Sequence, residues 1–483
     1  MAKEKEIYFE ENGIRYEDNT KTVMIGFNPS YDFGRNIVLP DTVKVIGTKY
    51  NGPKPFARFY WPDSILTIPS SVEKINEYAF DGATLKKVVL SEGIKEVSTN
   101  AFACAGIKEI SLPKSLKTIC FGAFGGSDIT KINLEDTSVE GIEENAFINT
   151  KLKYICIPET VKSLGAENFS ACKMLKKVDY KTPVSVPSRM FSGCEKLEEI
   201  SFNSNVKEIF DFAFYGCKKL KLIILPANLR IINGDAFSNS GLSALRIPRR
   251  VEIVGPFAFA DCEKLENIEI EDSEEHLSLK EYCFANTAIE CFAIPSSVNE
   301  MSKGILSGNK ELKSVDINAN TDYIPQHFTY CCPKLTDIKI SNKKINAIGK
   351  EAFFKTGIET INEQFRNIEV IEEKAFAECH NLKSALFTMP VEIHDFIFAN
   401  CENLEKIFII NSITATKNAF SNINPKSFKI FAPKLKLERI DKTVHDNIFI
   451  DKDELKQEII TSFPLRNASK IIEDFAAIER LDI

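Results

Sequence analysis

Apolar residues recur along this chain with a long and regular period. Sixteen positions, fifteen of them phenylalanine, follow one another at intervals of 22 or 23 residues, except for two intervals of 25. This period indicates a solenoid, because one repeat cannot bury its apolar face alone and stacked repeats bury it continuously. The ladder consists of Phe80, Phe102, Phe124, Phe147, Phe169, Phe191, Phe214, Phe237, Phe259, Phe284, Leu306, Phe328, Phe353, Phe376, Phe398 and Phe420.

The other apolar residues also keep fixed places within the repeat. The segment from Leu220 to Phe237 reads L-x-x-I-x-L-P-x-x-L-x-x-I-x-x-x-A-F, and residues 107–124 and 242–259 are equivalent. The I-x-L alternation has the period of two that predicts a short strand, and the proline ends this strand. The second apolar segment predicts a return along the opposite side of the coil, after which the Ala-Phe pair turns the chain inward.

Seven cysteines share one place in the repeat, three residues after the ladder position. In six of these repeats the next leucine comes six residues after the ladder position, and in the Cys331 repeat it comes seven after. Repeats without the cysteine, such as FDGATL, reach their apolar residue in five. Because catalysis would need one special thiol, we expect these cysteines to fill a longer turn as small apolar plugs. The seven are Cys172, Cys194, Cys217, Cys262, Cys331, Cys379 and Cys401.

The consensus L-x-x-I-x-L-P-x-x-V-x-x-I-x-x-x-A-F-x-x-C resembles the BspA-like leucine-rich repeats, also called the Treponema pallidum type. The resemblance extends from Ile37 to Phe431, with departures at Leu306, which replaces the phenylalanine, and near Phe365, where the strand-ending proline is missing. It implies an α/β repeat solenoid dominated by short β-strands, a right-handed curved leucine-rich-repeat superhelix with a parallel β-sheet on the concave face. Known members of the family include surface or secreted adhesion and host-interaction proteins of bacteria and protozoan parasites, and many others are uncharacterised, so the resemblance implies the fold more directly than the function.

The periodicity predicts three parts of the chain. Residues 1–60 form an N-terminal capping region with a degenerate first repeat, residues 61–431 form about sixteen repeats of 22–25 residues, and residues 432–483 form a C-terminal cap. In the last part, DKDELKQEIITSF and SKIIEDFAAIERL each place apolar residues on one helical face. We expect these two helices to cap the last coil, and docking of a partner is the alternative.

An aromatic insertion, GTKYNGPKPFARFYWPDS, interrupts the first repeat and is too long for the period. It contains Phe59, Tyr60 and Trp61, the last being the one tryptophan of the chain. Aromatic residues beside arginine in a loop are typical of interaction hot spots. The interpretation that we favour is that they cover the open end of the first coil, as terminal caps must.

The side chains that flank the strand isoleucine are expected to point out of the concave sheet. One stretch of this surface combines aromatic and basic residues on successive repeats, and the next is apolar. A surface that binds nothing would vary in the same way, which is the alternative. The candidate partner-binding residues of this surface are Lys131, Tyr154, Lys177, Leu222, Ile224 and Arg246.

No motif in the sequence indicates catalysis or metal binding. The chain contains no C-x-x-C, H-E-x-x-H, P-loop, G-x-G-x-x-G or G-x-S-x-G sequence. We therefore expect a non-enzymatic protein without metal or cofactor. The net charge of −7 and the pI of about 5.6 disfavour nucleic-acid binding. No apolar window reaches the length of a membrane span.

These observations predict a monomeric interaction protein that binds a protein or glycan through the concave sheet or the N-terminal loop. Two hypotheses stay open. The family resemblance favours a surface adhesin or host-interaction protein, located at the cell surface or secreted if a signal peptide was removed. The absence of a signal-like segment and the thirteen cysteines, expected to be reduced, favour a cytoplasmic scaffold or recognition subunit of a larger complex.

Overall fold

The computed structural model describes residues 8–28, 30–48, 54–56, 59–273 and 276–409, together with the short segments 413–416, 418–420, 423, 429–431 and 448–449. The chain forms two compact units, unit 1 with residues 1–242 and unit 2 with residues 243–483. The two helices predicted between residues 451 and 483 lie outside the described residues.

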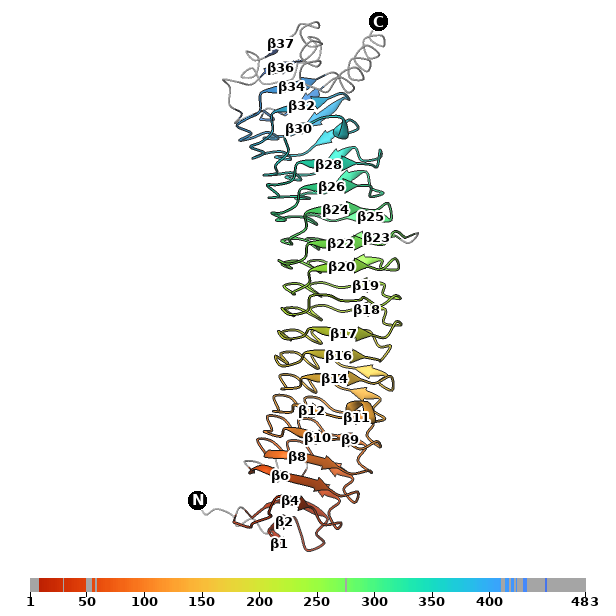
Figure 1. The fold of residues 1–483 in the computed structure, drawn as a ribbon, viewed down its shortest axis with the longest axis vertical. Coiled ribbons are helices and arrows are strands. Elements are labelled where there is room, and N and C mark those ends of the chain that lie inside the picture. The colour runs from red at the N-terminus through yellow and green to blue at the C-terminus, as the bar shows by residue number, and fades with distance from the viewer. Residues whose placement is uncertain are drawn as a thin grey trace. The chain divides into compact units, whose positions relative to one another are not determined.

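Each unit contains a parallel β-solenoid, which confirms the fold that the repeat period predicts (Figure 1). One coil consists of a front strand with the I-x-L motif, a side strand with the second apolar segment, and a turn around the ladder residue. Front strands pair in parallel with front strands of adjacent coils, and side strands pair with side strands. We call the two layers the front sheet and the side sheet. The front sheet is the face that the sequence predicts to carry the binding residues.

Unit 1 contributes eight front strands and nine side strands among its described residues. The front strands are β4 (Asn36–Val38), β6 (Tyr60–Ile68), β8 (Thr84–Leu90), β10 (Glu109–Ser111), β12 (Lys131–Ile132), β14 (Tyr154–Ile157), β16 (Lys177–Tyr180) and β17 (Glu199–Phe202). The side strands are β3 (Val23–Phe27), β5 (Val45–Ile46), β7 (Lys74–Ile75), β9 (Glu96–Val97), β11 (Thr118–Ile119), β13 (Gly141–Ile142), β15 (Ser163–Leu164), β18 (Glu208–Ile209) and β19 (Ile231–Ile232).

Unit 2 follows the same plan. The described front strands are β20 (Ala244–Ile247), β22 (Asn267–Ile270), β24 (Cys291–Ile294), β26 (Ser314–Ile317), β28 (Asp337–Ile340), β30 (Thr360–Ile361), β32 (Ser384–Phe387), β34 (Lys406–Ile409), β36 (Lys429–Phe431) and β37 (Ile448–Phe449). The side strands are β21 (Ile253–Val254), β23 (Leu277–Leu279), β25 (Val298–Met301), β27 (Tyr323–Ile324), β29 (Ala347–Ile348), β31 (Val370–Ile371), β33 (Val391–Ile393) and β35 (Ile413–Ala415).

The beginning of unit 1 is antiparallel. Strand β1 (Phe9–Glu11) pairs with β2 (Ile14–Tyr16), and β2 pairs with β3, so that the alternating segment GIRYEDNTKTVMI lies in this hairpin. The pairing becomes parallel from β3 to β5. Helical structure in the described residues is limited to two 3-10 segments, η1 (Leu134–Asp136) and η2 (Glu363–Phe365).

The ladder phenylalanines of unit 1 form one buried stack. From Phe80 to Phe237 every ring is completely buried, and neighbouring rings lie nearly parallel with centroids 4.4–5.7 Å apart. Phe56 adds one more ring, 4.1 Å from Phe80. Each buried phenylalanine contributes roughly 1.5–3 kcal/mol to the free energy of unfolding, so the repeated residue explains how a thin coil is held to its neighbours.

In unit 2 the ladder assignment of Phe328 is wrong by one residue. The main-chain N–H of a ladder residue donates to the carbonyl of the alanine before the next ladder residue, as Phe124 does to Ala146. Thr329 makes this bond to Ala352, and Leu306 makes it to Phe328. Thr329 therefore occupies the ladder position. Phe328 occupies the alanine position, and its ring meets Phe353 edge to face and does not stack on it.

Because the ladder position is Thr329, the cysteine three residues after it is Cys332. In the described residues Cys332 is completely buried, whereas Cys331 is half-buried and has a φ of 59°. The prediction that Cys331 plugs the turn is thus wrong, and Cys332 has that place. Leu335 then lies six residues after Thr329, which removes the anomalous spacing of seven. Other rung cysteines, Cys172 among them, are buried as predicted.

Candidate interaction surface

The front sheet of unit 1 brings Tyr154 and Lys177 side by side. They are register partners on β14 and β16, and Lys177 is in turn the partner of Glu199 on β17. Lys131 lies on β12, which is the last strand of a different group of hydrogen-bonded strands. The 3-10 segment η1 follows β12, and β12 does not pair with β14. The three predicted residues therefore occupy the same column, with the backbone pairing interrupted after Lys131.

Tyr154 is an aromatic side chain held in one orientation on this face. Its hydroxyl donates to Asp179 Oδ2 at 2.8 Å, and Asp179 Oδ1 accepts a hydrogen bond from Ser201 at 3.1 Å. Partial burial and the hydrogen bond to Asp179 raise the pKa of Tyr154 above its ordinary value. The side chain is 39% exposed, so the ring is fixed and still accessible.

The basic residues of the column differ in their partners. Lys177 Nζ lies 2.8 Å from Glu199 Oε1, and this hydrogen bond raises the pKa of Lys177. In unit 2, Arg246 Nε lies 2.8 Å from Glu271 Oε1. The exposed Lys131 has no ion-pair partner among the described residues. Lys177 and Arg246 are therefore neutralised within their own surface, and Lys131 offers an uncompensated positive charge.

Leu222 and Ile224 are exposed, as the sequence predicts, but they are not part of a strand. Residues 221–225 have no strand assignment, whereas β17 one coil earlier is regular. The two side chains are 66% and 87% exposed, respectively. They form an exposed apolar pair at the end of unit 1, and binding by them stays a prediction.

The three aromatic residues of the N-terminal insertion have different environments. Phe59 packs on Phe27 and on Trp61, with ring centroids 4.8 and 4.0 Å apart, and Trp61 also contacts Phe33 at 5.0 Å. Tyr60 is 71% exposed. Phe59 and Trp61 thus cover the first coil of the stack, and Tyr60 is the member of the three that a partner could reach fully.

The front face also includes the strands β4 and β6 at the beginning of unit 1. Strand β4 pairs with β6 and β6 with β8, which places Val38 and Thr67 in line with Val89. Val38 is 66% exposed. The half-repeat NIVLPDTVKVIG indicates the first of these strands in the sequence, because its I-V-L-P matches the strand motif of later repeats.

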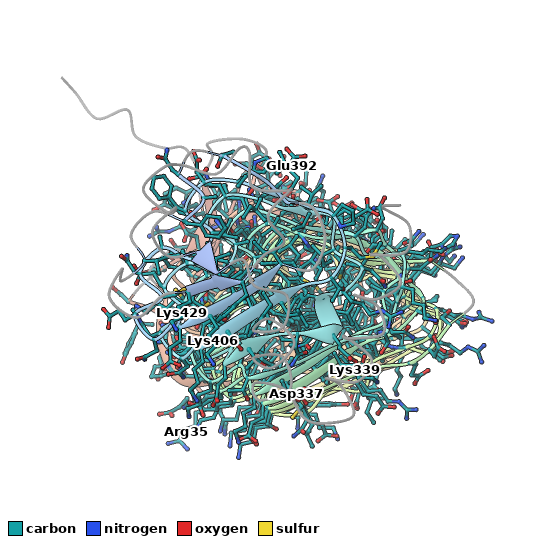
Figure 2. The ribbon with its side chains drawn as sticks, turned by 90° about the horizontal axis from the view of Figure 1, so that it is seen from above. Arg35, Asp337, Lys339, Glu392, Lys406 and Lys429 are labelled. Carbon is teal, nitrogen blue, oxygen red and sulfur yellow. The ribbon has the colours of Figure 1, made fainter. Side chains whose placement is uncertain are left out.

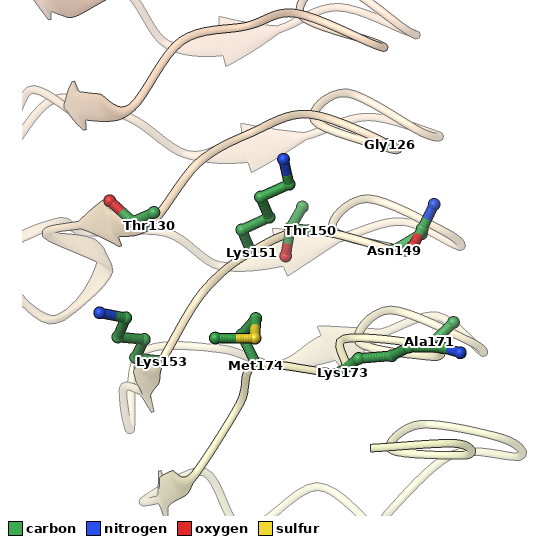
Figure 3. Close-up of a pocket in the computed structure, with 9 residues that line it drawn as sticks. All are labelled: Gly126, Thr130, Asn149, Thr150, Lys151, Lys153, Ala171, Lys173 and Met174. Atoms are coloured by element: carbon green, nitrogen blue, oxygen red, sulfur yellow. The ribbon is translucent and has the colours of Figure 1, made fainter. Parts of the chain in front are cut away.

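Sequence reasoning also missed a hollow at the turns of unit 1 (Figure 3). It measures about 400 Å³ and lies beside the edge of the front sheet. No motif in the sequence indicates it, because its lining residues come from three consecutive coils. Its lining residues are Gly126, Thr130, Asn149, Thr150, Lys151, Lys153, Ala171, Lys173 and Met174.

The front face of unit 2 is charged. Lys339 Nζ lies 2.6 Å from Asp316 Oδ2 on the adjacent strand, and Lys406 is the register partner of Lys429 on β34 and β36. Figure 2 shows Lys339, Lys406 and Lys429 along one side of this unit and Glu392, from the side strand β33, on another. The Lys339–Asp316 pair neutralises part of this surface, whereas Lys406 and Lys429 place like charges on adjacent strands.

The described residues contain no group of three or more His, Cys, Asp or Glu side chains arranged to hold a metal ion. Nor does any helix in this part of the chain combine the length and apolar character needed to cross a membrane.

Comparison with known proteins agrees with this architecture. In solved structures, 89% of this chain matches 98% of a leucine-rich repeat protein from Bacteroides ovatus ATCC 8483, at 22% identity and a TM-score of 0.55. The pneumococcal vaccine antigen PcpA matches at 20% identity over 92% of this chain and 99% of its own, with a TM-score of 0.43. A leucine-rich repeat protein from Eubacterium ventriosum ATCC 27560 matches at 19% identity over 70% and 83%, with a TM-score of 0.36. No curated protein matches.

A model of the BspA type leucine rich repeat region matches the chain in six copies. The copies cover residues 34–150, 58–176, 184–310, 232–356, 275–383 and 330–455. Together they span most of the sequence, and they contain the strand motif, the Ala-Phe turn and the rung cysteine described above. The chain therefore belongs to the BspA-type leucine-rich-repeat family.

Proposed function

We propose that this chain is a non-enzymatic interaction protein that binds a protein partner on the front face of unit 1. The contact is centred on Tyr154, with Lys131 and Lys177 on either side of it. The family and the fold are those of a repeat protein whose open sheet offers a broad surface. Front strands about 4.8 Å apart give eight strands a length of roughly 35 Å, enough for a protein contact.

The orientation of Tyr154 is the observation that carries this proposal. A tyrosine held by the hydrogen bond to Asp179 loses little side-chain entropy on binding, and tyrosine is among the residues that dominate protein interfaces. Lys131 adds a charge without a described partner, which favours an acidic patch on the bound protein.

The test compares variants of the purified chain as bait for proteins extracted from the cells that make it and from their surroundings. Tyr154→Ala should lose a defined set of bound proteins, by about tenfold or more, as truncation of a hot-spot tyrosine does. Tyr215→Ala is the matched control, since Tyr215 is 38% exposed but lies on a turn away from the front sheet. If the wild-type chain, Tyr154→Ala and Tyr215→Ala all bound the same set of proteins, the proposal would be refuted.

The cellular location distinguishes an adhesin from an internal scaffold. Protease treatment of intact cells, followed by immunoblotting, should remove a surface-displayed adhesin. Survival of the protein until lysis would leave the recognition subunit of an internal complex. The front-face proposal applies in either location.

A further inference from the structure

The hollow in unit 1 lies beside two neighbouring turns of different length. The turn after Phe147 reaches Leu152 in five residues, whereas the turn after Phe169 takes six to reach Leu175. The additional residue is Met174, which lies half-buried at the bottom of the hollow. The longer turn thus places an additional side chain beside the shorter turn, next to the pocket.

Three lysines surround the pocket. Lys151 and Lys173 come from equivalent places in the two turns, and Lys153 lies where the chain enters β14 (Figure 3). Lys151 Nζ lies 2.6 Å from Asp128, and Lys173 Nζ lies 3.2 Å from Glu195.

The charge around the pocket is not balanced. Asp128 is shared, because Lys108 Nζ also approaches it to 2.6 Å. The exposed Lys153 has no ion-pair or hydrogen-bond partner for its ammonium among the described residues. The lining of this hollow therefore contains three lysines and no acidic residue, although the chain as a whole has a net charge of −7. An anion in the pocket would provide Lys153 with the ion-pair partner that the described residues do not supply.

Neutral groups complete the lining. Thr130 and Asn149 add a hydroxyl and an amide, and Met174 together with the lysine methylenes adds apolar surface. The volume of about 400 Å³ lies within the range of small-ligand pockets. Two other kinds of anionic ligand fit this pocket less well. The carboxylate side chain of a peptide would fill only a small part of the volume, and a lipid tail would need a wider apolar surface.

We infer that this pocket binds an anionic saccharide, a sugar residue that carries a carboxylate or a sulfate group. A sugar ring presents C–H faces to Met174 and the lysine stems, and its hydroxyls reach Thr130 and Asn149. The acidic group then lies against Lys153. This site is separate from the protein contact at Tyr154 and does not depend on that proposal.

The experiment is isothermal titration of the purified full chain with a sulfated uronic-acid disaccharide. The neutral disaccharide, carboxyl-reduced and unsulfated, and poly-glutamate are titrated in parallel. Two variants test the pocket: Lys153→Gln/Lys173→Gln removes charge, and Met174→Trp fills the hollow without changing charge. The control Lys95→Gln/Lys207→Gln removes two exposed lysines elsewhere in unit 1. Thermal unfolding of each variant verifies the fold.

We expect the charged disaccharide to bind and the neutral one not to bind. Both pocket variants should weaken binding by about tenfold, while the control stays within about twofold. Equal binding of the neutral sugar, no binding of the charged one, or an unaffected Met174→Trp variant would each overturn the inference. Tighter binding of poly-glutamate would identify an acidic peptide as the ligand instead. Tyr154→Ala should retain disaccharide binding, which separates this result from the protein contact.

Discussion

The thiol of Cys332 donates a hydrogen bond to the main-chain carbonyl of Leu306, with 3.2 Å between sulfur and oxygen. Five other rung cysteines do the same to the ladder residue of the preceding coil, at 3.1–3.3 Å. Asn309 replaces the cysteine in one coil and donates its amide to Phe284 at 3.0 Å. The rung cysteine is thus more than an apolar plug, because it satisfies a carbonyl that the turn leaves buried.

Replacement of Cys332 by alanine should lower the free energy of unfolding by about 1–3 kcal/mol. The change leaves the carbonyl of Leu306 without a donor and opens a small cavity. Cys331→Ala, one residue away, should change it by about 0.5 kcal/mol or less. Urea unfolding measures both. If the two variants were equally stable, the register assigned here would be wrong.

Gly241 is predicted to be irreplaceable by alanine. It lies in a five-residue turn that follows a six-residue turn, and a Cβ atom there would overlap the main-chain carbonyl of Lys218. The neighbouring backbone must shift, so Gly241→Ala should destabilise by about 1–3 kcal/mol. At Gly141 the nearest atom is 4.0 Å from the new Cβ, and Gly141→Ala should be neutral or slightly stabilising. Thermal unfolding of both variants tests this contrast.

The thiols should fall into reactive and unreactive classes at pH 8. Burial raises the pKa of Cys172 to about 11 and that of Cys332 to about 12, so that these thiols remain protonated. Cys104 and Cys291 are exposed. Brief iodoacetamide treatment followed by peptide mass mapping should modify Cys104 and Cys291 first. Urea-unfolded protein should be modified at all thirteen cysteines. Early labelling of Cys172 in folded protein would contradict its burial.

Glu140 should contribute an acid-sensitive stabilisation. Hydrogen bonds from Lys117 and Lys162, at 2.7 and 2.8 Å, lower its pKa from the ordinary 4.5 to about 2. Because the pKa is lower in the folded state, the contribution is complete above pH 4.5 and disappears as the pH falls toward 2. The exposed ion pairs make it small and reducible by salt.

The measurement is the melting temperature of wild type and Glu140→Gln as a function of pH. The difference should be largest above pH 4.5 and shrink on acidification through that window. A difference that is constant with pH would show that Glu140 stabilises the fold by packing alone.

The error at Phe328 shows where pattern reasoning loses the register. Phe328 and Thr329 are adjacent, and an aromatic residue in the ladder is the better match to the pattern. The structure gives the ladder place to Thr329 because its N–H reaches Ala352 and because Cys332 then reaches Leu306. The spacing of seven residues from Phe328 to Leu335, where the other cysteine-containing repeats have six, indicated the shift in the sequence.

The sequence by itself determined the coil. A repeat of 22 or 23 residues cannot bury its phenylalanine and its strand residues alone, and stacking the repeats with parallel strands buries them. It also determined the outward columns, since side chains alternate along a strand. Only the tertiary structure decided which charges neutralise each other across coils, how Tyr154 is oriented by Asp179, and where three consecutive coils form a pocket. These features depend on atoms from different coils, which lie about 22 residues apart in the chain and are brought together only by stacking.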